Sequence, residues 1–405
     1  MATRSLVSLA LSLVFALSSL AADSEHTFVT TIAGQPGVAG SADGSTATAS
    51  FNRPTWLDVV RDREVPRAAL PGDVYVIDRV NDAIRQISGN SVTTLKVARG
   101  YWDLNTIVQF DFGGPFGGGI AVEPPNGSCG SGPWDRGFFV AATGSQQLAL
   151  VSPYGMLAAR DDVSPVIGTG AAGAADGNDV TSRFNNPSGI ALSWDYGRQS
   201  AYGRAMFVAD SGNHTIRRVG FTLSFEACPQ AKIITTLAGS AGVAGAQDGR
   251  GAEARFNAPR GVATGPDGSV YVADSGNHTI RRVALDGTVT TIAGAAGIAG
   301  SNDGPALEAR LNTPSGIDVN AAGEVFIADT GNHTIRKLTT DGSLITIAGT
   351  PGVGGFADGS TARALFNGPV GLKIAPDGAL LVADTSNNVI RRIGGSPARR
   401  RGVGR

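Results

Sequence analysis

Short apolar runs separated by Gly-rich turns follow one another along most of the chain. In the most regular stretch, apolar runs at 261–264, 269–273, 280–284 and 288–293 are divided by turns at 265–268, 274–277 and 286–287. Runs of this length, rich in Val, Ile and Thr and bounded by Gly, Pro, Asn and Asp, are typical of β-strands joined by tight turns. We therefore predict a four-stranded antiparallel meander for residues 261–293.

The same pattern recurs with a fixed wording. Each copy contains T-I-A-G, an Asp-Gly loop, F-N-x-P, an apolar V-A-D and N-H-T-I-R-R, and its Asp-Gly aspartate is found at Asp43, Asp176, Asp248, Asp303 and Asp358. The last two intervals are both 55 residues (303 − 248 and 358 − 303). A repeat of this period indicates a modular array, in which neighbouring units bury one another's faces.

Four-stranded meanders that stack face to face around an axis form a β-propeller. The V-A-D aspartates mark five blades, and residues 138–143 fill the gap after the first, with Thr143 expected in the aspartate position. The chain begins with a fourth-strand pattern at 28–33 and ends with a third-strand pattern at 389–393. We predict an all-β, six-bladed propeller of four-stranded antiparallel blades, with the last blade closed by the N-terminal strand.

The repeated phrase resembles the NHL repeat family, with Asn-His-Thr at 213–215, 277–279 and 332–334. The resemblance covers about residues 28–394 and implies one propeller domain over 23–394. It leaves function open, because NHL propellers include enzymes, RNA-binding proteins and interaction domains.

Composition restricts these alternatives. The formal net charge is −1, which argues against nucleic acid as a partner because such partners require a basic face. Residues 1–22 read as a secretory signal peptide, with Arg4 ahead of the apolar stretch 6–17, which is too short for a membrane span. We expect a monomer, secreted or in the secretory-pathway lumen, with a basic, disordered tail at 395–405.

Two modifications fit that compartment. Cys129 and Cys228 are expected in loops of neighbouring blades, either joined in a disulfide or as two unpaired thiols. Sequons occur at Asn126, Asn213, Asn277 and Asn332. Asn126 lies in a long loop and is the better glycosylation candidate, because the other three fall in tight turns.

The repeated polar residues predict structure rather than chemistry. His214, His278 and His333 occupy equivalent turns of separate blades, too far apart to share one zinc ion. An Asp and an Arg seven residues later recur once per blade and are interpreted as a structural brace: Asp78/Arg85, Asp210/Arg217, Asp274/Arg281, Asp329/Arg336 and Asp384/Arg391. The Asp-Gly loops lack the clustered carboxylates of a calcium site. We predict no metal site and no cofactor.

Irregular positions in a regular array are the better binding candidates. The residues after the corner prolines, here called the corner ring, are expected to face the axis: Thr55, Phe116, Ser188, Arg260, Ser315 and Val370. A second candidate surface is aromatic and includes Trp102 and Trp134, with filling of gaps in the degenerate blade as the alternative.

The metal-binding histidines of NHL-fold amidating lyases fall at the corner-ring position, and none is present here. Lactonase-like propellers hold a divalent ion with axial Glu, Asn and Asp, for which Glu123 and Asp318 leave a narrow opening. We therefore favour a non-catalytic module that binds a protein, peptide or glycan. The alternatives are a metal-dependent hydrolase or lyase with an axial site and a structural matrix component.

Overall fold

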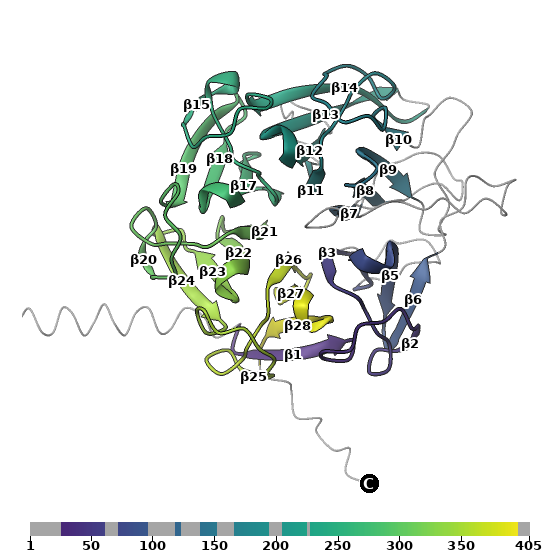
Figure 1. The fold of residues 1–405 in the computed structure, drawn as a ribbon, viewed down its shortest axis with the longest axis vertical. Coiled ribbons are helices and arrows are strands. Elements are labelled where there is room, and N and C mark those ends of the chain that lie inside the picture. Colours follow the sequence, from purple (N-terminus) through teal and green to yellow (C-terminus); the bar gives the residue numbers. More distant parts are fainter. Residues whose placement is uncertain are drawn as a thin grey trace, which may run out of the picture.

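Six antiparallel sheets are arranged around one axis, and each forms a blade of a β-propeller (Figure 1). The computed structural model describes residues 26–60, 72–95, 118–122, 138–151, 166–193, 205–224 and 227–395. The predicted fold class and blade number are confirmed. Within the described residues, no helix has the length and apolar character needed to cross a bilayer.

The first three blades follow the chain from the axis outward. Blade one contains β3 (Pro54–Val59), β4 (Val74–Asp78), β5 (Ala83–Ser88) and β6 (Ser91–Leu95). Blade two contains β7 (Ile120–Val122), β8 (Phe138–Ala142), β9 (Gln147–Val151) and β10 (Val166–Ile167). Blade three contains β11 (Pro187–Ser193), β12 (Ala205–Asp210), β13 (Thr215–Ser224) and β14 (Ala227–Gly239).

The last three blades repeat this order. Blade four contains β16 (Val262–Thr264), β17 (Val270–Asp274), β18 (Thr279–Val283) and β19 (Thr288–Gly294). Blade five contains β21 (Pro314–Val319), β22 (Val325–Asp329), β23 (Thr334–Leu338) and β24 (Ser343–Ala348). Blade six contains β26 (Pro369–Ile374), β27 (Leu380–Asp384), β28 (Val389–Gly394) and, as its outer strand, β1 (Phe28–Ala33).

The two ends of the propeller meet in blade six. β1 pairs with β28 in antiparallel register, with Phe28 opposite Gly394 and Thr31 opposite Arg391. In Figure 1, β1 crosses the outside of β28 at the base of the ring. The predicted closure by the N-terminal strand is confirmed, and it removes an open sheet edge.

Four blades also carry a short fifth strand that the sequence reasoning missed. These two-residue strands pair with the outer strand of their own blade: β2 (Gly44–Ser45), β15 (Gly249–Arg250), β20 (Gly304–Pro305) and β25 (Gly359–Ser360). Each begins at the glycine of an Asp-Gly pair, where φ lies between 133° and 153°. This backbone conformation favours glycine, and it brings the loop back against the sheet.

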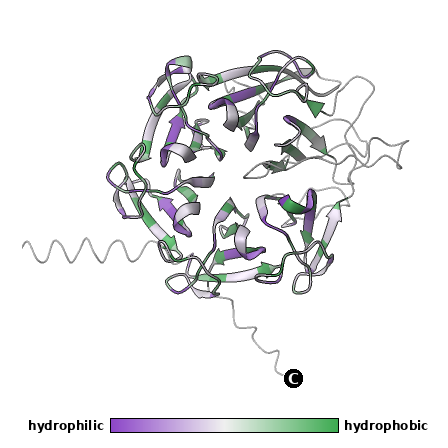
Figure 2. Ribbon diagram, viewed as in Figure 1, coloured by the Kyte–Doolittle hydropathy of each residue, from purple (hydrophilic) through white to green (hydrophobic). Residues whose placement is uncertain are grey.

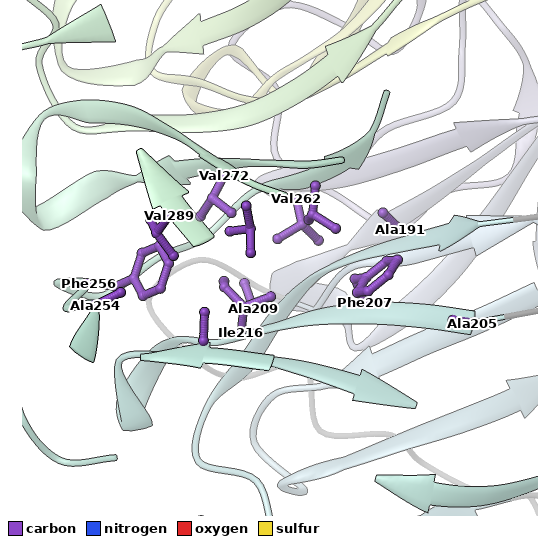
Figure 3. Packing of buried hydrophobic residues seen from close by; sticks show 13 residues of the cluster. Ala191, Ala205, Phe207, Ala209, Ile216, Ala254, Phe256, Val262, Val272 and Val289 are labelled. Carbon is purple, nitrogen blue, oxygen red and sulfur yellow. The ribbon is translucent and has the colours of Figure 1, made fainter. Parts of the chain in front are cut away.

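The core lies between the blades. Between blades three and four, Phe207 and Ile216 on one side face Val262, Val272 and Phe256 on the other, and all are buried (Figure 3). Figure 2 shows hydrophobic residues distributed through every sheet and hydrophilic stretches in third strands such as β18 and β23. The strands are thus buried on both faces, as a closed ring of sheets requires.

Close packing at the axis depends on glycine. A Cβ on Gly261 would lie 2.1 Å from the Ser315 carbonyl oxygen, and Gly189, Gly316 and Gly371 meet the next inner strand in the same way. The sixth blade in this series has Trp56 instead, buried beside Val370. Neighbouring inner strands therefore touch through their backbones, as the glycine pattern predicted.

Two positions differ from the sequence prediction. Ala142, not Thr143, is the counterpart of Asp210, because Ala142 pairs with Gln147 as Asp210 pairs with Thr215. The degenerate V-A-A-T wording hid this one-residue offset. Cys228 lies within β14 rather than in a connection, because the β13–β14 hairpin is longer than expected. Cys129 lies outside the described residues, so the disulfide stays a prediction.

Candidate functional site

Each regular blade contains a buried ion pair. In blade four, Asp274 Oδ2 accepts hydrogen bonds from Arg281 Nη1 (2.8 Å) and Asn277 Nδ2 (2.7 Å), and its Oδ1 accepts one from the Asn257 N–H (2.7 Å). Both side chains of the ion pair are fully buried. The pair thus connects strands β17 and β18 to the inner corner of the same blade.

The arginine also holds the Asp-Gly loop. Arg281 Nη2 lies 2.7 Å from Asp248 Oδ1 and 3.0 Å from the Gln247 carbonyl oxygen. Asp248 further accepts hydrogen bonds from the N–H and hydroxyl of Thr291 on β19. The half-exposed loop aspartates are therefore engaged by arginine and threonine donors. The guanidinium also lies 5.0–5.2 Å from the centroid of the anchoring Phe in blades one, three, four and six.

The same ion pair is present in five blades, with Nη1–Oδ2 distances of 2.8–3.0 Å: Asp78–Arg85, Asp210–Arg217, Asp274–Arg281, Asp329–Arg336 and Asp384–Arg391. In blade two the two positions are Ala142 and Ala149, both fully buried. Blade two has replaced a buried charge pair with two methyl groups.

Burial and hydrogen bonding act against each other on these carboxylates. Burial raises the pKa of Asp210, Asp274, Asp329 and Asp384 to about 6, against the lowering effect of their hydrogen-bond donors and arginine. All partners of Asp274 given above are donors, so the ionised carboxylate is the form that they satisfy at neutral pH.

The repeated histidines connect neighbouring blades. His278 Nδ1 accepts a hydrogen bond from the Thr313 N–H (3.0 Å), and His214 and His333 accept from Ala258 (3.0 Å) and Gly368 (2.9 Å). Burial lowers the pKa of all three imidazoles. The acceptor role requires neutral Nδ1. This role could have been suspected from the position of each histidine before a strand, but its partner lies in the next repeat.

Other side chains make the same contact elsewhere in the ring. Asn388 Oδ1 accepts from the Arg53 N–H (2.8 Å), and Gln146 Oε1 from the Asn186 N–H (2.5 Å). Every donor is the residue before a corner proline and has φ of 47–59°. A left-handed conformation is costly for residues other than glycine. The blade-to-blade hydrogen bond therefore holds an otherwise unfavourable corner.

A hydroxyl forms a second connection between blades. Thr385 Oγ1 donates to the Pro54 carbonyl (2.7 Å), Thr330 to Pro369 (2.6 Å) and Thr143 to Pro187 (2.8 Å). Ser211 and Ser275 donate to Pro259 and Pro314. We call these hydroxyl contacts and the acceptor contacts of the preceding paragraphs the interblade links.

The turn asparagines are consumed by structure. Asn277 Nδ2 donates to both Asp274 and the Gly245 carbonyl oxygen (2.6 Å), and Asn213 and Asn332 do the same in their blades. All three are buried. Their amides are therefore inaccessible for glycosylation in the folded chain. Asn126 lies outside the described residues.

The corner ring is mostly closed. Thr55, Ser188, Ser315 and Val370 are 0–5% exposed, and the Ser188 hydroxyl lies 2.7 Å from Ser211 Oγ and 3.0 Å from the Arg260 carbonyl oxygen. Arg260 is partly exposed, and its Nη1 lies 3.5 Å from Ser315 Oγ. Burial lowers the pKa of Arg260 to about 9, so its guanidinium is charged at neutral pH. Phe116, Trp102 and Trp134 lie outside the described residues.

A second irregular group lies further along the inner strands. Lys373 Nζ is 3.4 Å from Asp318 Oδ1 and 3.8 Å from Asp58 Oδ1, which joins blades five, six and one. Asp318 also accepts from the Ile374 N–H, and Asp58 from the Val122 N–H. The counterparts in blades two, three and four are Ala121, Ala191 and Ala263. One half of the axis is therefore charged at this depth, and the other is apolar.

Metal ligands do not gather elsewhere in the part of the chain described here: no group of three His, Cys, Asp or Glu side chains is arranged to hold an ion. Glu123 lies outside the described residues. The axial group consists of two carboxylates and an ammonium, so a cation is already supplied by Lys373.

The fold and the repeated braces define a class, the NHL-repeat β-propellers. Residues 256–283 and 311–338 match the model of the NHL repeat. The chain is an NHL-repeat six-bladed β-propeller.

Relatives of known sequence share parts of the chain. It is 29% identical over 287 residues to the protein SUPPRESSOR OF QUENCHING 1, chloroplastic, of Arabidopsis thaliana, covering 56% of this chain and 26% of that protein. It is 30% identical over 216 residues to NHL repeat-containing protein 2 of Gallus gallus, covering 47% and 28%. The chain thus spans about a quarter of the length of these relatives.

Among solved structures, a Bacteroides thetaiotaomicron protein of unknown function superimposes with a TM-score of 0.63 at 19% identity, covering 91% of this chain and 76% of that one. An auxiliary nutrient binding protein of the same organism gives 0.60 at 17% identity, covering 92% and 77%. At these identities the likeness concerns the fold alone.

Proposed function

We propose that this chain is a secreted, non-catalytic binding module that holds a protein, peptide or glycan through an acidic group at the mouth of the axis. The observation that carries the proposal is the position of Arg260. It is the partly exposed, cationic member among the described residues of a corner ring that is otherwise closed.

The surroundings of Arg260 suit a carboxylate, sulfate or phosphate. Hydroxyl groups of Ser315 and Thr330 lie next to one another (2.9 Å), and Ser315 is within reach of the guanidinium. A guanidinium in a partly desolvated place forms stronger hydrogen bonds to anions than it does in bulk water. Uronic acids, sulfated sugars and acidic side chains all offer such a group.

Secretion rests on the leader expected at 1–22. We propose that this segment is removed on export, and mass spectrometry of the mature N-terminus tests that part separately. A mature chain that retains residues 1–22 would contradict the secretory part of the proposal without affecting the binding site.

The binding test uses the full chain as bait against material from the secretory compartment. R260A is expected to reduce capture roughly 10- to 100-fold, because a charged hydrogen bond is lost. R250A is the matched control, since Arg250 is an exposed arginine remote from the axis. Equal capture by wild type and R260A, with unchanged melting temperatures, would contradict the proposal.

A second candidate function is a metal-dependent hydrolase or lyase. The observation that favours it is the pair of nearly buried axial carboxylates, Asp58 and Asp318, on either side of Lys373. If an ion displaces the ammonium, K373A should bind a divalent cation more tightly than wild type and gain hydrolytic activity. Isothermal titration of both proteins with Mn²⁺, Ca²⁺ and Zn²⁺ tests this candidate.

A further inference from the structure

One repeated position departs from its equivalents in burial. The residue three places before the V-A-D aspartate position is large and apolar in every blade: Tyr75, Phe139, Phe207, Tyr271, Phe326 and Leu381. Five of these are 1–4% exposed, whereas Tyr271 in blade four is only partly buried. Something that covers the other side chains does not cover Tyr271.

Tyr271 lines a cavity of about 340 Å³ between blades four and five. Ile292, Val325 and Leu338 supply apolar walls, and Arg282, Gly323 and Thr340 lie at its edge. Arg282 is held by Asp267 at 2.6 Å. The cavity therefore combines an aromatic face, aliphatic walls and a polar rim, as small-molecule sites commonly do.

The equivalent place between blades five and six is filled by an aromatic ring of the chain itself. His26 is buried there, with its ring centroid 5.5 Å from that of Phe326, the counterpart of Tyr271. His26 Nε2 lies 3.1 Å from the Gly378 carbonyl oxygen, so this nitrogen donates. A cation flanks this place too, since Lys337, the counterpart of Arg282, lies 6.0 Å from the Phe326 centroid.

Gly323 occupies the position of Gly378 at the cavity. Both close the same turn, with N–H donation to Asn320 (3.0 Å) in blade five and to Ala375 (2.9 Å) in blade six. A Cβ placed on Gly323 would meet no described atom within 4 Å. The backbone that receives His26 is thus repeated at the cavity without a ring of the described chain in place.

A different solution is present between blades three and four. There, Leu285 lies over Gly268, within 3.2 Å of a Cβ built on it. The counterpart of Leu285 in blade five is Thr340, which is shorter and polar. The opening beside Tyr271 therefore follows from two local changes: no counterpart of His26 and a threonine in place of leucine.

We propose that the cavity between blades four and five binds a small molecule carrying a neutral, planar N–H heteroaromatic ring. The ring packs against Tyr271, between the aliphatic walls, and donates a hydrogen bond to the Gly323 carbonyl oxygen, as His26 does to Gly378. The neighbouring Arg282 disfavours a cationic ring. This site lies between two blades, away from Arg260, and is independent of the function proposed for the axis.

Indole is a suitable probe, and 1-methylindole is its matched control because it lacks the donor. Ligand-observed NMR competition on the full chain is expected to show indole binding about fivefold more tightly than 1-methylindole, the effect of one neutral hydrogen bond. Equal affinities, or no indole binding up to its solubility limit, would overturn the proposal.

Two variants locate the binding. T340L copies the leucine of blade four and should abolish indole binding while leaving the melting temperature unchanged or raised. Y271L, which keeps an apolar wall and removes the aromatic face, should weaken indole at least severalfold. Indole binding that survives both substitutions would place it elsewhere and refute the assignment.

A chemical-rescue experiment checks the template. H26A opens the equivalent place between blades five and six, and added neutral imidazole should restore the melting temperature that H26A loses. Wild type should show no such rise. Failure of imidazole to stabilise H26A would remove the basis for assigning a ring to the cavity beside Tyr271.

Discussion

Blade four and blade two have the same four strands but different polar interiors. Blade four holds the Asp274–Arg281 pair, which reaches the Asp248 loop, whereas blade two has Ala142 and Ala149 at those positions. Yet both blades make the interblade links: His278 bonds to Thr313 and Ser275 to Pro314, and Gln146 bonds to Asn186 and Thr143 to Pro187.

The comparison separates two functions that the repeated phrase combines. The brace organises the loop and corner within a blade, and it is dispensable where both charges are replaced together. The interblade links hold the corner of the next blade in its left-handed conformation and are kept even where the repeat has decayed. Isosteric removal of a buried ion pair is tolerated, but removal of one partner is not.

The largest expected effect comes from breaking the brace in blade four. R281A leaves Asp274 buried without its counter-charge and should lower the free energy of unfolding by about 3–5 kcal/mol. Chemical denaturation measures the change. A loss below about 1 kcal/mol, the usual value for an exposed pair, would show that the pair is not a brace.

The double variant D274A/R281A sharpens the comparison, because it copies blade two. It should be less destabilising than the sum of the two single variants, with a favourable coupling of about 1–3 kcal/mol. Additive losses would mean that blade two tolerates alanine for a reason other than the joint removal of both charges.

A smaller effect is expected from the interblade links. Q146A in blade two and H278A in blade four should each lower the free energy of unfolding by about 1–2 kcal/mol, because each leaves a buried backbone N–H without its acceptor. Denaturation curves of both variants provide the test. A loss in blade four alone would contradict the view that blade two depends on the same links.

The smallest effect is a dependence on pH. The pKa of His278 is lowered in the folded chain, so its contribution is present above the unfolded value near 6.5 and is lost as pH falls through the lowered folded value. H278N keeps an oxygen acceptor, as Asn388 does in blade six, without this titration. The stability difference, wild type minus H278N, should therefore decrease from pH 7.5 to pH 5. A constant difference would contradict the neutral-acceptor role of His278.

Much of the fold was predictable from the sequence because the repeat determines it. The blade number, the pairing of β1 with β28 and the glycine contacts at the axis all follow from positions in the repeated phrase. The brace was predictable because Asp274 and Arg281 lie in one repeat. His278 and Thr313 lie in successive repeats, so their contact needed coordinates.

Other features depend on single departures from the repeat. The one-residue offset at Ala142 was hidden because blade two lacks the charged landmarks. The cavity beside Tyr271 depends on Thr340 and on the position of His26, far away in the sequence. Lys373 stands between Asp58 and Asp318 only because the ring closes. Such contacts leave no periodic signal.

Metal analysis of the purified full chain tests the central claim most directly, namely that the polar residues of the propeller serve structure and binding rather than metal-dependent catalysis. Atomic emission on protein dialysed without chelator should find no divalent ion in stoichiometric amount, because Lys373 supplies the axial positive charge. One ion per chain, lost together with D58N or D318N, would contradict the account and establish an axial metal centre.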